Sequence, residues 1–178
     1  MSSYSTLISP FTIPADNHVK GFSARSFIDT KSTFFLAKRM VDLVVSAAFI
    51  VCVLSWFIPL LAFLITMDSK GPVFFRQKRV GRGGRSFYCL KFRTMYVNKE
   101  CHIKQAEKND RRITRIGKML RKTNIDEFPQ FINVFLGDMS LVGPRPHMYA
   151  DCGRFSQVVN GYKFRNMVKP GITGLAQV

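Results

Sequence analysis

The sequence predicts a helix-rich α+β protein, in which a broken, membrane-inserted helix near the N-terminus precedes a small cytoplasmic domain with a short β-hairpin. Three observations support this fold class. Residues 43–67 form an apolar run without a charged side chain. A strand–turn–strand pattern occupies residues 73–92, and apolar residues recur at helical spacing between residues 111 and 137.

The apolar run predicts insertion into a membrane. As a helix, residues 43–67 would extend over about 37 Å, whereas the hydrocarbon core of a bilayer is about 30 Å thick. Pro59 lacks a backbone donor and is expected to break or kink this helix. Ser55 lies four residues earlier, where its hydroxyl can bond to a backbone group that the break frees. Ser55 and Pro59 therefore mark the expected helix break.

Basic residues flank the apolar run on both sides, as Lys38 and Arg39 before it and as Lys70, Arg76, Lys78 and Arg79 after it. Because positively charged flanks tend to stay on the cytoplasmic side, both helix ends are expected there. A helix that enters and returns satisfies both flanks, whereas a straight span satisfies only one. We therefore favour a re-entrant helix over residues 38–70. A loosely ordered tail without a secretory signal precedes it over residues 1–37, and a catalytic domain follows over residues 71–178.

Two strands and a helix are expected in the first part of the domain. The strands are predicted at residues 73–77 and 86–92, and the turn between them contains Gly81, Gly83 and Gly84. These glycines fit neither a Walker nor a dinucleotide-binding pattern, because the order is strand, turn, strand. The spacing of apolar residues predicts a helix over residues 111–121.

A last helix is expected to begin at Thr123 or Asn124, either of which can cap it, and to end at Gly137. Pro129 would fall in its first turn, where a missing donor costs little. One face of this helix is apolar and is expected to meet a core or the membrane, through Ile125, Phe128, Ile132 and Phe135. The opposite face carries Asp126, Gln130 and Asn133.

The charge balance indicates a polyanionic partner. The net charge is +16, and residues 76–122 carry sixteen Lys or Arg against three acids. Such an excess is typical of proteins that bind nucleic acid, anionic membranes or phosphorylated substrates. A hydrophobic content of 47% excludes a solvated disordered chain. Nucleic acid is disfavoured, because the basic stretch lacks a recognition helix and an RNA-binding signature. The four cysteines lack zinc-site spacing and are expected to be reduced thiols.

Asp126 and Glu127 are the candidate catalytic pair. Consecutive helical positions point about 100° apart, so one carboxylate can face a reacting atom while the other holds a metal beside it. Compensation of the helix dipole is an alternative reading of two acids in a first turn. Lys91 and Arg93, on one strand, and Arg145, between two prolines, are candidate phosphate ligands, with solvated surface charge as the alternative.

Several blocks in order closely resemble the bacterial sugar transferases of the small monotopic phosphoglycosyl transferase family. The resemblance runs from Lys38 to Val178 and includes the apolar segment with Pro59 and the blocks KRMVD, GPVFFRQKRVG, KFRTM, DRRITRIGKMLRK, DEFPQFINVFLGDMSLVGPRP and KPGITGLAQV. It implies transfer of a sugar 1-phosphate from a UDP-sugar to polyprenyl phosphate, usually undecaprenyl phosphate. This reaction initiates lipid-linked glycan synthesis at the cytoplasmic face of the bacterial inner membrane, with downstream glycosyltransferases as further partners.

The resemblance also implies roles for individual residues. Asp126 matches the nucleophile, which expels UMP and forms a covalent aspartyl phosphosugar that the lipid phosphate then attacks. Glu127 matches the Mg²⁺ ligand, and Pro59 matches the proline that breaks the re-entrant helix. The basic positions around the phosphates match Lys91, Arg93, Arg121 and Arg145.

Two alternatives stay open. Asp126 can act as a general base in a ternary complex instead of as a nucleophile. Family members also continue past the GLAQV block with an arginine-bearing stretch and amphipathic helices, whereas this chain ends at Val178. A catalytically inactive, truncated membrane protein that binds anionic lipid or partner enzymes is therefore the alternative function.

Overall fold

The computed structural model of this chain describes residues 32–97, 110–148, 151–152, 155 and 162–174. Most of the predicted tail lies outside the described residues. The chain divides into two compact units, residues 1–37 and 38–178. The second unit combines helices with two small two-stranded sheets, which confirms a helix-rich α+β fold.

One long apolar helix stands at the start, as predicted. It comprises α2 (Ser32–Phe49), a π-helical stretch η1 (Ile50–Leu54) and α3 (Ser55–Asp68). The helix begins six residues before the expected start at Lys38. An 18-residue window within Thr33–Asp68 has a mean hydropathy of 2.7, and the length and composition of this segment suffice to cross a membrane.

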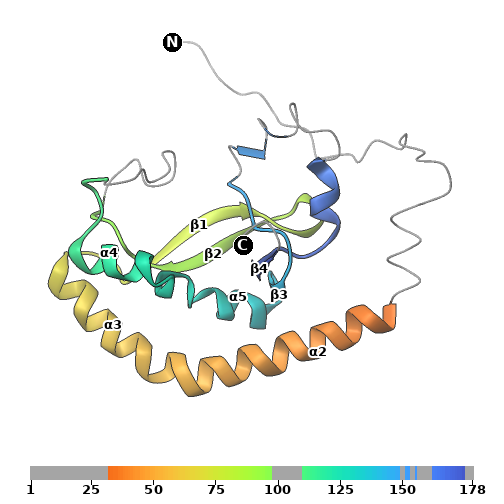
Figure 1. Cartoon of the computed structure of the whole chain (residues 1–178), viewed down its shortest axis with the longest axis horizontal. Helices are drawn as coiled ribbons and strands as arrows, with labels where there is room; N and C mark the ends of the chain where they lie inside the picture. Colours follow the sequence, from red (N-terminus) through yellow and green to blue (C-terminus); the bar gives the residue numbers. More distant parts are fainter. Residues whose placement is uncertain (1–31, 98–109, 149–150, 153–154, 156–161, 175–178) are drawn as a thin grey trace, which may run out of the picture. The chain divides into compact units, whose positions relative to one another are not determined.

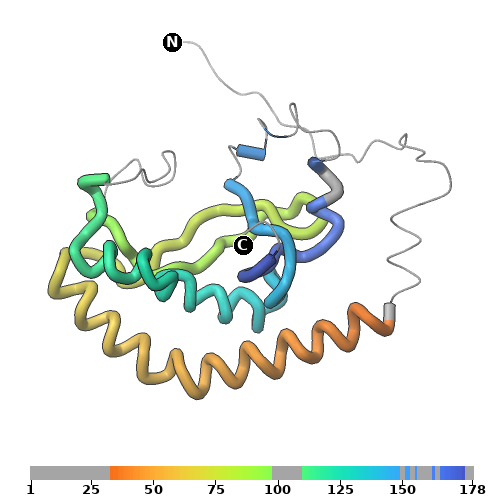
Figure 2. Tube along the Cα trace, in the orientation of Figure 1, coloured from red at the N-terminus to blue at the C-terminus, as the bar shows by residue number. Residues whose placement is uncertain are grey.

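The long helix changes direction around η1, as the trace in Figure 2 shows. Ser55 Oγ donates a hydrogen bond to the carbonyl of Val51 at 2.6 Å. Pro59 lies inside α3 and has no N–H to give to the carbonyl one turn earlier. A π-helical stretch and a proline are both recognised causes of bent helices. The irregularity therefore lies at and just before the predicted Ser55–Pro59 position, although the chain stays helical through it.

The predicted hairpin is present. β1 (Phe74–Val80) pairs antiparallel with β2 (Ser86–Phe92) in a register from Phe74↔Phe92 to Val80↔Ser86. The second strand matches its predicted bounds, whereas the first extends three residues beyond the expected end. Gly83 (φ 67°) and Gly84 (φ 77°) both adopt the left-handed conformation, which a tight turn requires and glycine allows at no steric cost.

The helix expected over residues 111–121 begins later, as α4 (Arg115–Lys122). Thr114 caps it by accepting a hydrogen bond from the Gly117 N–H at 2.9 Å. Residues 111 and 112 form a turn instead, and Ile113 forms a β-bridge with Met95. Gly117 is required at its position, since a Cβ there would lie 2.0 Å from the carbonyl oxygen of Thr94.

The last predicted helix is divided into two pieces, which corrects the expected continuous helix. Asn124 has a left-handed backbone (φ 56°) and does not cap through its side chain. A single 3₁₀ turn, η3 (Ile125–Glu127), follows it, and α5 (Gln130–Leu136) begins after Pro129. Gly137 ends α5 with φ 96°, as predicted. The acidic pair consequently lies on a 3₁₀ turn before the helix.

Three short elements were not predicted. β3 (Ser140–Val142) and β4 (Gly171–Thr173) form a parallel pair, and η4 (Tyr162–Met167) is a 3₁₀ helix. Strands of three residues are too short to show a period in the sequence. The parallel pair matters for the site, because the loop after β3 carries Arg145.

In the second unit, α4 and α5 lie between the hairpin and the long helix (Figure 1). One apolar cluster joins α3, β2 and α4 through Leu61, Ile65, Phe92 and Leu120. A second cluster joins β2 to α5 and the chain after it through Phe87, Cys89, Val134 and Met139. The hairpin is therefore packed at both ends against α4 and α5, the helices that flank the turn with the acidic pair.

Polar contacts tie both ends of the long helix to this domain. Near its start, the buried Asp42 carboxylate accepts hydrogen bonds from Ser140 Oγ (2.8 Å) and the Leu141 N–H (3.0 Å). At its end, Asp68 Oδ2 accepts from the Ile116 N–H at 2.9 Å. Asp42 and Asp68, which are separated by most of the length of the long helix, therefore both form hydrogen bonds with the same domain.

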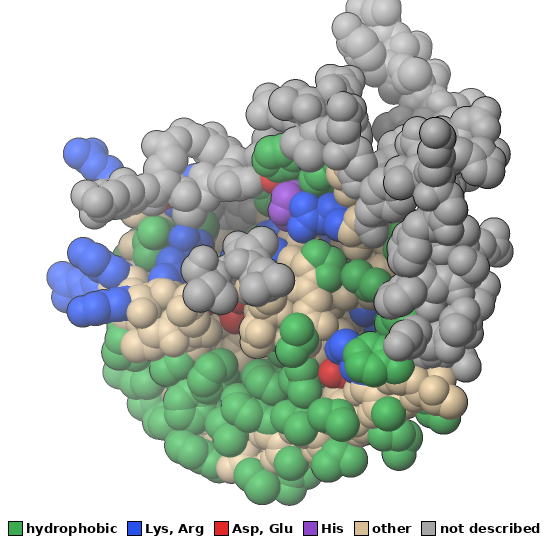
Figure 3. All heavy atoms as spheres, turned by 45° about the vertical axis from the view of Figure 1, so that its right-hand side comes forward, with side chains coloured by type: hydrophobic (Ala, Val, Ile, Leu, Met, Phe, Trp, Pro, Cys, Tyr) green, Lys and Arg blue, Asp and Glu red, His purple; other side chains and the backbone are tan. Residues whose placement is uncertain are grey.

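The outer side of the long helix is apolar. Figure 3 shows hydrophobic side chains gathered over the lower part of the molecule, where this helix lies. We call this the apolar surface; its exposed members in the second unit are Met40, Val41, Val44, Val45, Val51, Trp56, Leu60, Phe63 and Met67. Most of these side chains would be costly to leave in water.

Candidate active site

A cleft of about 1290 Å³ lies between the hairpin and the helices. Its walls contain all six residues of the predicted phosphate and acidic sites, which are Lys91, Arg93, Arg121, Asp126, Glu127 and Arg145. Ser55 and Pro59 lie in the long helix and do not line it. The fold therefore brings together cationic and acidic groups that are up to 54 residues apart in sequence.

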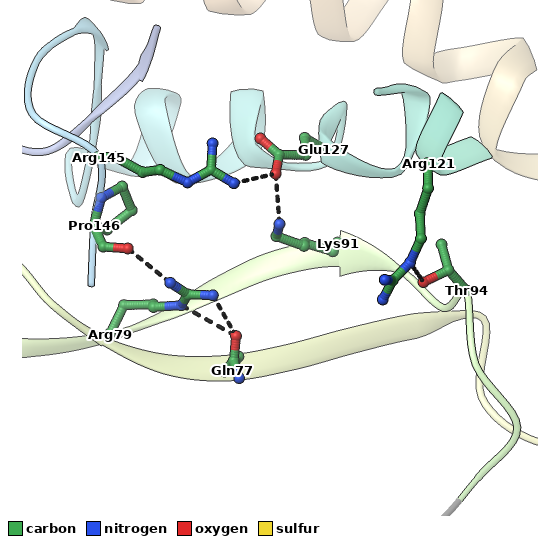
Figure 4. A network of polar contacts seen from close by, with 8 residues as sticks. All are labelled: Gln77, Arg79, Lys91, Thr94, Arg121, Glu127, Arg145 and Pro146. Carbon is green, nitrogen blue, oxygen red and sulfur yellow. Dashed lines mark hydrogen bonds and ion pairs between the residues drawn. The ribbon is translucent and has the colours of Figure 1, made fainter. Parts of the chain in front are cut away.

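Glu127 is the centre of the polar network in the cleft. Its Oε1 accepts a hydrogen bond from Lys91 Nζ at 2.6 Å and another from Arg145 Nη2 at 3.2 Å. Figure 4 shows the two cations approaching this oxygen from β2 and from the loop after β3. Burial would raise the pKa of Glu127, but Lys91, Arg145 and a hydrogen bond from Gln130 together lower it. Glu127 is therefore ionised at neutral pH.

Asp126 experiences the opposite shift. Its side chain is only 8% exposed, and this burial raises the pKa of the carboxyl group, with a further contribution from the charge of Glu127. Lys91 and Arg121 oppose the rise without cancelling it. Two adjacent carboxylates with pKa values pushed apart are typical of sites where each has a separate role.

Arg121 and Arg93 are held in different ways. Arg121 Nε donates to Thr94 Oγ1 at 2.8 Å, within the cleft wall (Figure 4). Arg93 lies one residue past the end of β2. Its guanidinium donates to the backbone carbonyls at the end of α3 and just beyond, those of Ile65, Ser69 and Lys70.

These contacts give Arg93 a structural function at the end of the long helix. Cations there stabilise the carbonyls that the last helical turn leaves without partners. Among the buried side-chain polar atoms of the described residues, Arg93 Nε alone lacks a hydrogen-bond partner. Its predicted contact with phosphate stays a prediction, whereas its contact with the helix end is direct.

Two residues of the site were missed from the sequence. Arg79 Nη1 donates to the Pro146 carbonyl at 2.7 Å, and its Nη2 donates to Gln77 Oε1 at 2.6 Å. Both side chains line the cleft. Sequence reasoning counted Arg79 only as a basic flank of the membrane segment. The period-2 alternation of β1 places both residues on one face and was the available signal.

The polar face of α5 also serves the hairpin. Asn133 is buried, accepts a hydrogen bond from the Leu90 N–H at 2.9 Å and donates to the Tyr88 carbonyl at 2.8 Å. Its amide thus acts like an additional strand residue beside β2. This contact sets the distance between β2, which carries Lys91, and the turn that carries Glu127.

The donor set of the cleft fits a shared Mg²⁺ site. Mg²⁺ usually takes one or two protein carboxylates and completes its shell with water and substrate phosphate. Asp126 and Glu127 are the acids among the described lining residues. Nowhere in the described ranges do three or more His, Cys, Asp or Glu residues form a metal-binding group. These two carboxylates would hold such an ion jointly with a substrate.

Comparisons with known proteins identify relatives of this chain. The family model for bacterial sugar transferases matches residues 33–178. A UDP-glucose:undecaprenyl-phosphate glucose-1-phosphate transferase of Xanthomonas campestris pv. campestris is 47% identical over 154 residues, which cover 85% of this chain and 31% of that protein. A protein of the same name from Caulobacter vibrioides is 46% identical over 80% of this chain and 54% of its own length.

A relative with a different sugar in its name is equally similar. The UDP-N-acetylgalactosamine-undecaprenyl-phosphate N-acetylgalactosaminephosphotransferase of Aeromonas hydrophila is 51% identical over 118 residues, which cover 66% of this chain and 28% of that protein. This chain thus spans between 28% and 54% of the length of these three relatives.

Proposed function

Because the chain belongs to the bacterial sugar transferase family, we propose that it transfers a sugar 1-phosphate from a UDP-sugar to undecaprenyl phosphate and releases UMP. The names of its relatives pair a UDP-sugar with undecaprenyl phosphate. One observation carries the proposal: the buried Asp126 lies beside Glu127, which two cations hold, in a cleft with further cations. That arrangement suits a reaction at an anionic phosphorus centre.

Asp126 is the proposed nucleophile. A carboxylate oxygen of Asp126 attacks the phosphorus that bears the sugar, the bond from this phosphorus to the bridging oxygen breaks, and UMP leaves with that oxygen. The raised pKa of Asp126 supports this role, because a more basic carboxylate is a better nucleophile once it is ionised. The product of this step is an aspartyl phosphosugar.

The second step regenerates the carboxylate. An oxygen of the lipid phosphate attacks the same phosphorus, and the bond to the Asp126 oxygen breaks. Two steps allow a water-soluble donor and a lipid acceptor to use one site in turn. Neither substrate then has to occupy the cleft together with the other.

The cations and Glu127 prepare the phosphates for attack. Lys91 and Arg145 lie within hydrogen-bonding distance of Glu127, so phosphate oxygens beside this carboxylate would meet both positive charges. Arg121 adds a guanidinium near Asp126. Glu127, with Asp126 beside it, would hold Mg²⁺, which supplies further neutralisation of the pyrophosphate charge.

The long helix is proposed to enter and leave the membrane on the cytoplasmic face of the inner membrane. Asp42 near its start and Asp68 at its end both accept hydrogen bonds from the same domain. A helix that crossed the bilayer completely would place these two carboxylates on opposite sides. The basic flanks and the irregularity at η1 and Pro59 also support re-entry.

The test is transfer of radiolabel from a UDP-sugar labelled in the β-phosphate. Without undecaprenyl phosphate, label is expected on the wild-type protein, and Asp126→Asn is expected to lose both this label and UMP release. Asp138→Asn is the matched control, because Asp138 is an exposed acid on the chain after α5. UMP release that requires the lipid acceptor, with no labelled protein, would replace the nucleophile by a general base. Turnover retained by Asp126→Asn would refute both roles.

A further inference from the structure

The loop that carries Arg145 is held by a row of hydrogen bonds to its carbonyl oxygens. Four consecutive carbonyls, those of residues 144–147, each accept a hydrogen bond from another part of the domain. In chain order the donors are the Gly171 N–H (3.0 Å), Arg165 Nη2 (2.7 Å), Arg79 Nη1 (2.7 Å) and the Val80 N–H (3.2 Å). Two of these four donors are guanidinium groups.

The sequence explains why external donors are needed. Pro144 and Pro146 have no N–H, so this stretch cannot form a regular ladder with a neighbouring strand. The prolines restrict the backbone torsions on both sides of Arg145, but they do not fix the position of the loop. Its carbonyls supply much of this fixation, and side chains from β1 and η4 reach two of them.

Both guanidinium groups are themselves oriented by neighbours. Arg79 donates through Nε and Nη2 to Gln77 Oε1, and the buried Gln77 donates in turn to Met148 Sδ. The guanidinium carbon of Arg165 lies 5.0 Å from the ring centre of Tyr162, and its Nη1 is 3.3 Å from His147 Nδ1. In each arginine, neighbouring side chains therefore orient the guanidinium, and one of its nitrogens donates to a carbonyl of the loop.

We propose that Arg79 and Arg165 are positioning residues that act through Arg145. They bond to two consecutive carbonyls of the loop, those of Pro146 and Arg145, so that the Arg145 guanidinium stays beside Glu127 before substrate arrives. The inference rests on the proposed function, in which Arg145 contacts the phosphates. Arg165 is not among the described residues that line the cleft, so its influence on the phosphates would have to pass through the loop.

Lysine is not an adequate replacement at either position. The planar guanidinium of Arg79 bonds Gln77 and the Pro146 carbonyl at the same time, and that of Arg165 bonds the Arg145 carbonyl while lying over Tyr162. An ammonium group lacks this fork of donors and stacks less well. The proposal therefore predicts partial rescue by lysine, and not full rescue.

A double-mutant cycle on UMP release tests the proposal. Arg165→Met and Arg79→Met are each expected to lower kcat/KM about tenfold or more, and the lysine variants by less. In an Arg145→Met background neither substitution should lower kcat/KM by more than about twofold, because the group that they position is gone. Arg85→Met, at an exposed arginine before β2, is the matched control and should change nothing. Losses that multiply in the Arg145→Met background would overturn the proposal.

A second measurement separates this inference from the proposed function. A nitroxide attached at Arg145→Cys, in a chain without its other cysteines, reports the motion of the loop without any turnover. The label is expected to become more mobile with Arg165→Met or Arg79→Met and to stay unchanged with Arg85→Met. An unchanged label in the first two variants would refute positioning even if the enzyme turns over. A more mobile label in these variants, together with no UMP release by the wild-type chain, would instead refute only the proposed function.

Discussion

The cleft around Glu127 pairs its charged groups within a few ångströms, whereas the apolar surface of the long helix has no charged side chain between residues 43 and 67. In the cleft, Lys91 and Arg145 converge on one oxygen atom. On the apolar surface, the exposed side chains share only their hydrophobic character. The interactions in the cleft depend on the positions of single atoms. Membrane association through the apolar surface depends on its total apolar area.

The two regions should therefore respond differently to substitution. An exchange in the cleft removes a directed interaction and should change chemistry without changing where the protein resides. An exchange on the apolar surface should change membrane association, with an effect that follows hydrophobicity. Asp42, Asp68 and Arg93 connect the regions and should mainly affect stability.

The largest effect is expected from Glu127→Gln. The neutral amide leaves Lys91 and Arg145 without their shared counter-charge and removes the proposed metal ligand. We expect UMP release to fall by about 10³-fold or more, a size typical for loss of electrostatic stabilisation at a reacting centre. Flotation with liposomes should be unchanged. UMP release within about tenfold of wild type would contradict the expectation that a single exchange in the cleft removes an interaction needed for the chemistry.

A charge on the apolar surface should give the converse result. Phe63→Lys places an ammonium group where a 62% exposed phenyl ring lies on α3. A lysine at membrane depth costs about 3 kcal/mol, so a large part of the protein should leave the liposome fraction in flotation. Tyr88→Lys is the matched control, because Tyr88 is 60% exposed but lies on the hairpin. Equal losses in both variants would show that the apolar surface is not the membrane contact.

The connection between the regions should have a smaller effect. Asp42 is 4% exposed and accepts two hydrogen bonds, so Asp42→Ala leaves Ser140 and the Leu141 N–H without their acceptor. We expect a loss of about 2 kcal/mol in the free energy of unfolding, measured by denaturation in detergent micelles. Asp68→Ala removes the hydrogen bond from the Ile116 N–H and should cost about 1 kcal/mol. A larger loss for Asp68→Ala than for Asp42→Ala would contradict the expectation that the contact near the start of the long helix contributes more to stability.

The sequence predicted each region well but not the geometry between them. The apolar helix, the second strand and the end of α5 at Gly137 followed from period, charge and glycine chemistry. The turn at Asp126 did not, because a left-handed Asn124 interrupts a pattern that otherwise has helical spacing. Spacing alone does not distinguish a continuous helix from a 3₁₀ turn followed by a helix.

The predicted site residues all line one cleft, yet their partners came from tertiary structure. Arg79 looked like a membrane-flanking charge, and its contact with Pro146 joins segments 67 residues apart. Arg93 was predicted as a phosphate ligand, and the contact that the fold adds is with carbonyls at the end of α3. Residue type predicts what a side chain can bind, whereas long-range packing decides which partner it meets.

The smallest effect concerns the stability cost of the proposed nucleophile. Burial raises the pKa of Asp126, so its ionised form destabilises the folded state. The sign follows from linkage: stability that depends on a protonated Asp126 is present in acid and is lost as the pH rises through the raised pKa. Asp126→Asn removes this cost and should be the more stable protein at neutral pH. A gain of about 1 kcal/mol would raise Tm by about 2–4 °C in a chain of this size.

The pH dependence distinguishes this explanation from a general effect of the amide. In thermal unfolding in detergent micelles, the difference in Tm between Asp126→Asn and wild type should grow from acid to neutral pH, because the aspartate is neutral in acid. Asp138→Asn, at an exposed acid, should show no such trend. A difference that is constant across this range would show that desolvation of Asp126 is not its cause. A difference in Tm that grows with pH, together with lost turnover, would mean that the reactive carboxylate of Asp126 lowers the stability of the folded protein. On the apolar surface, no single ionised side chain has such an effect.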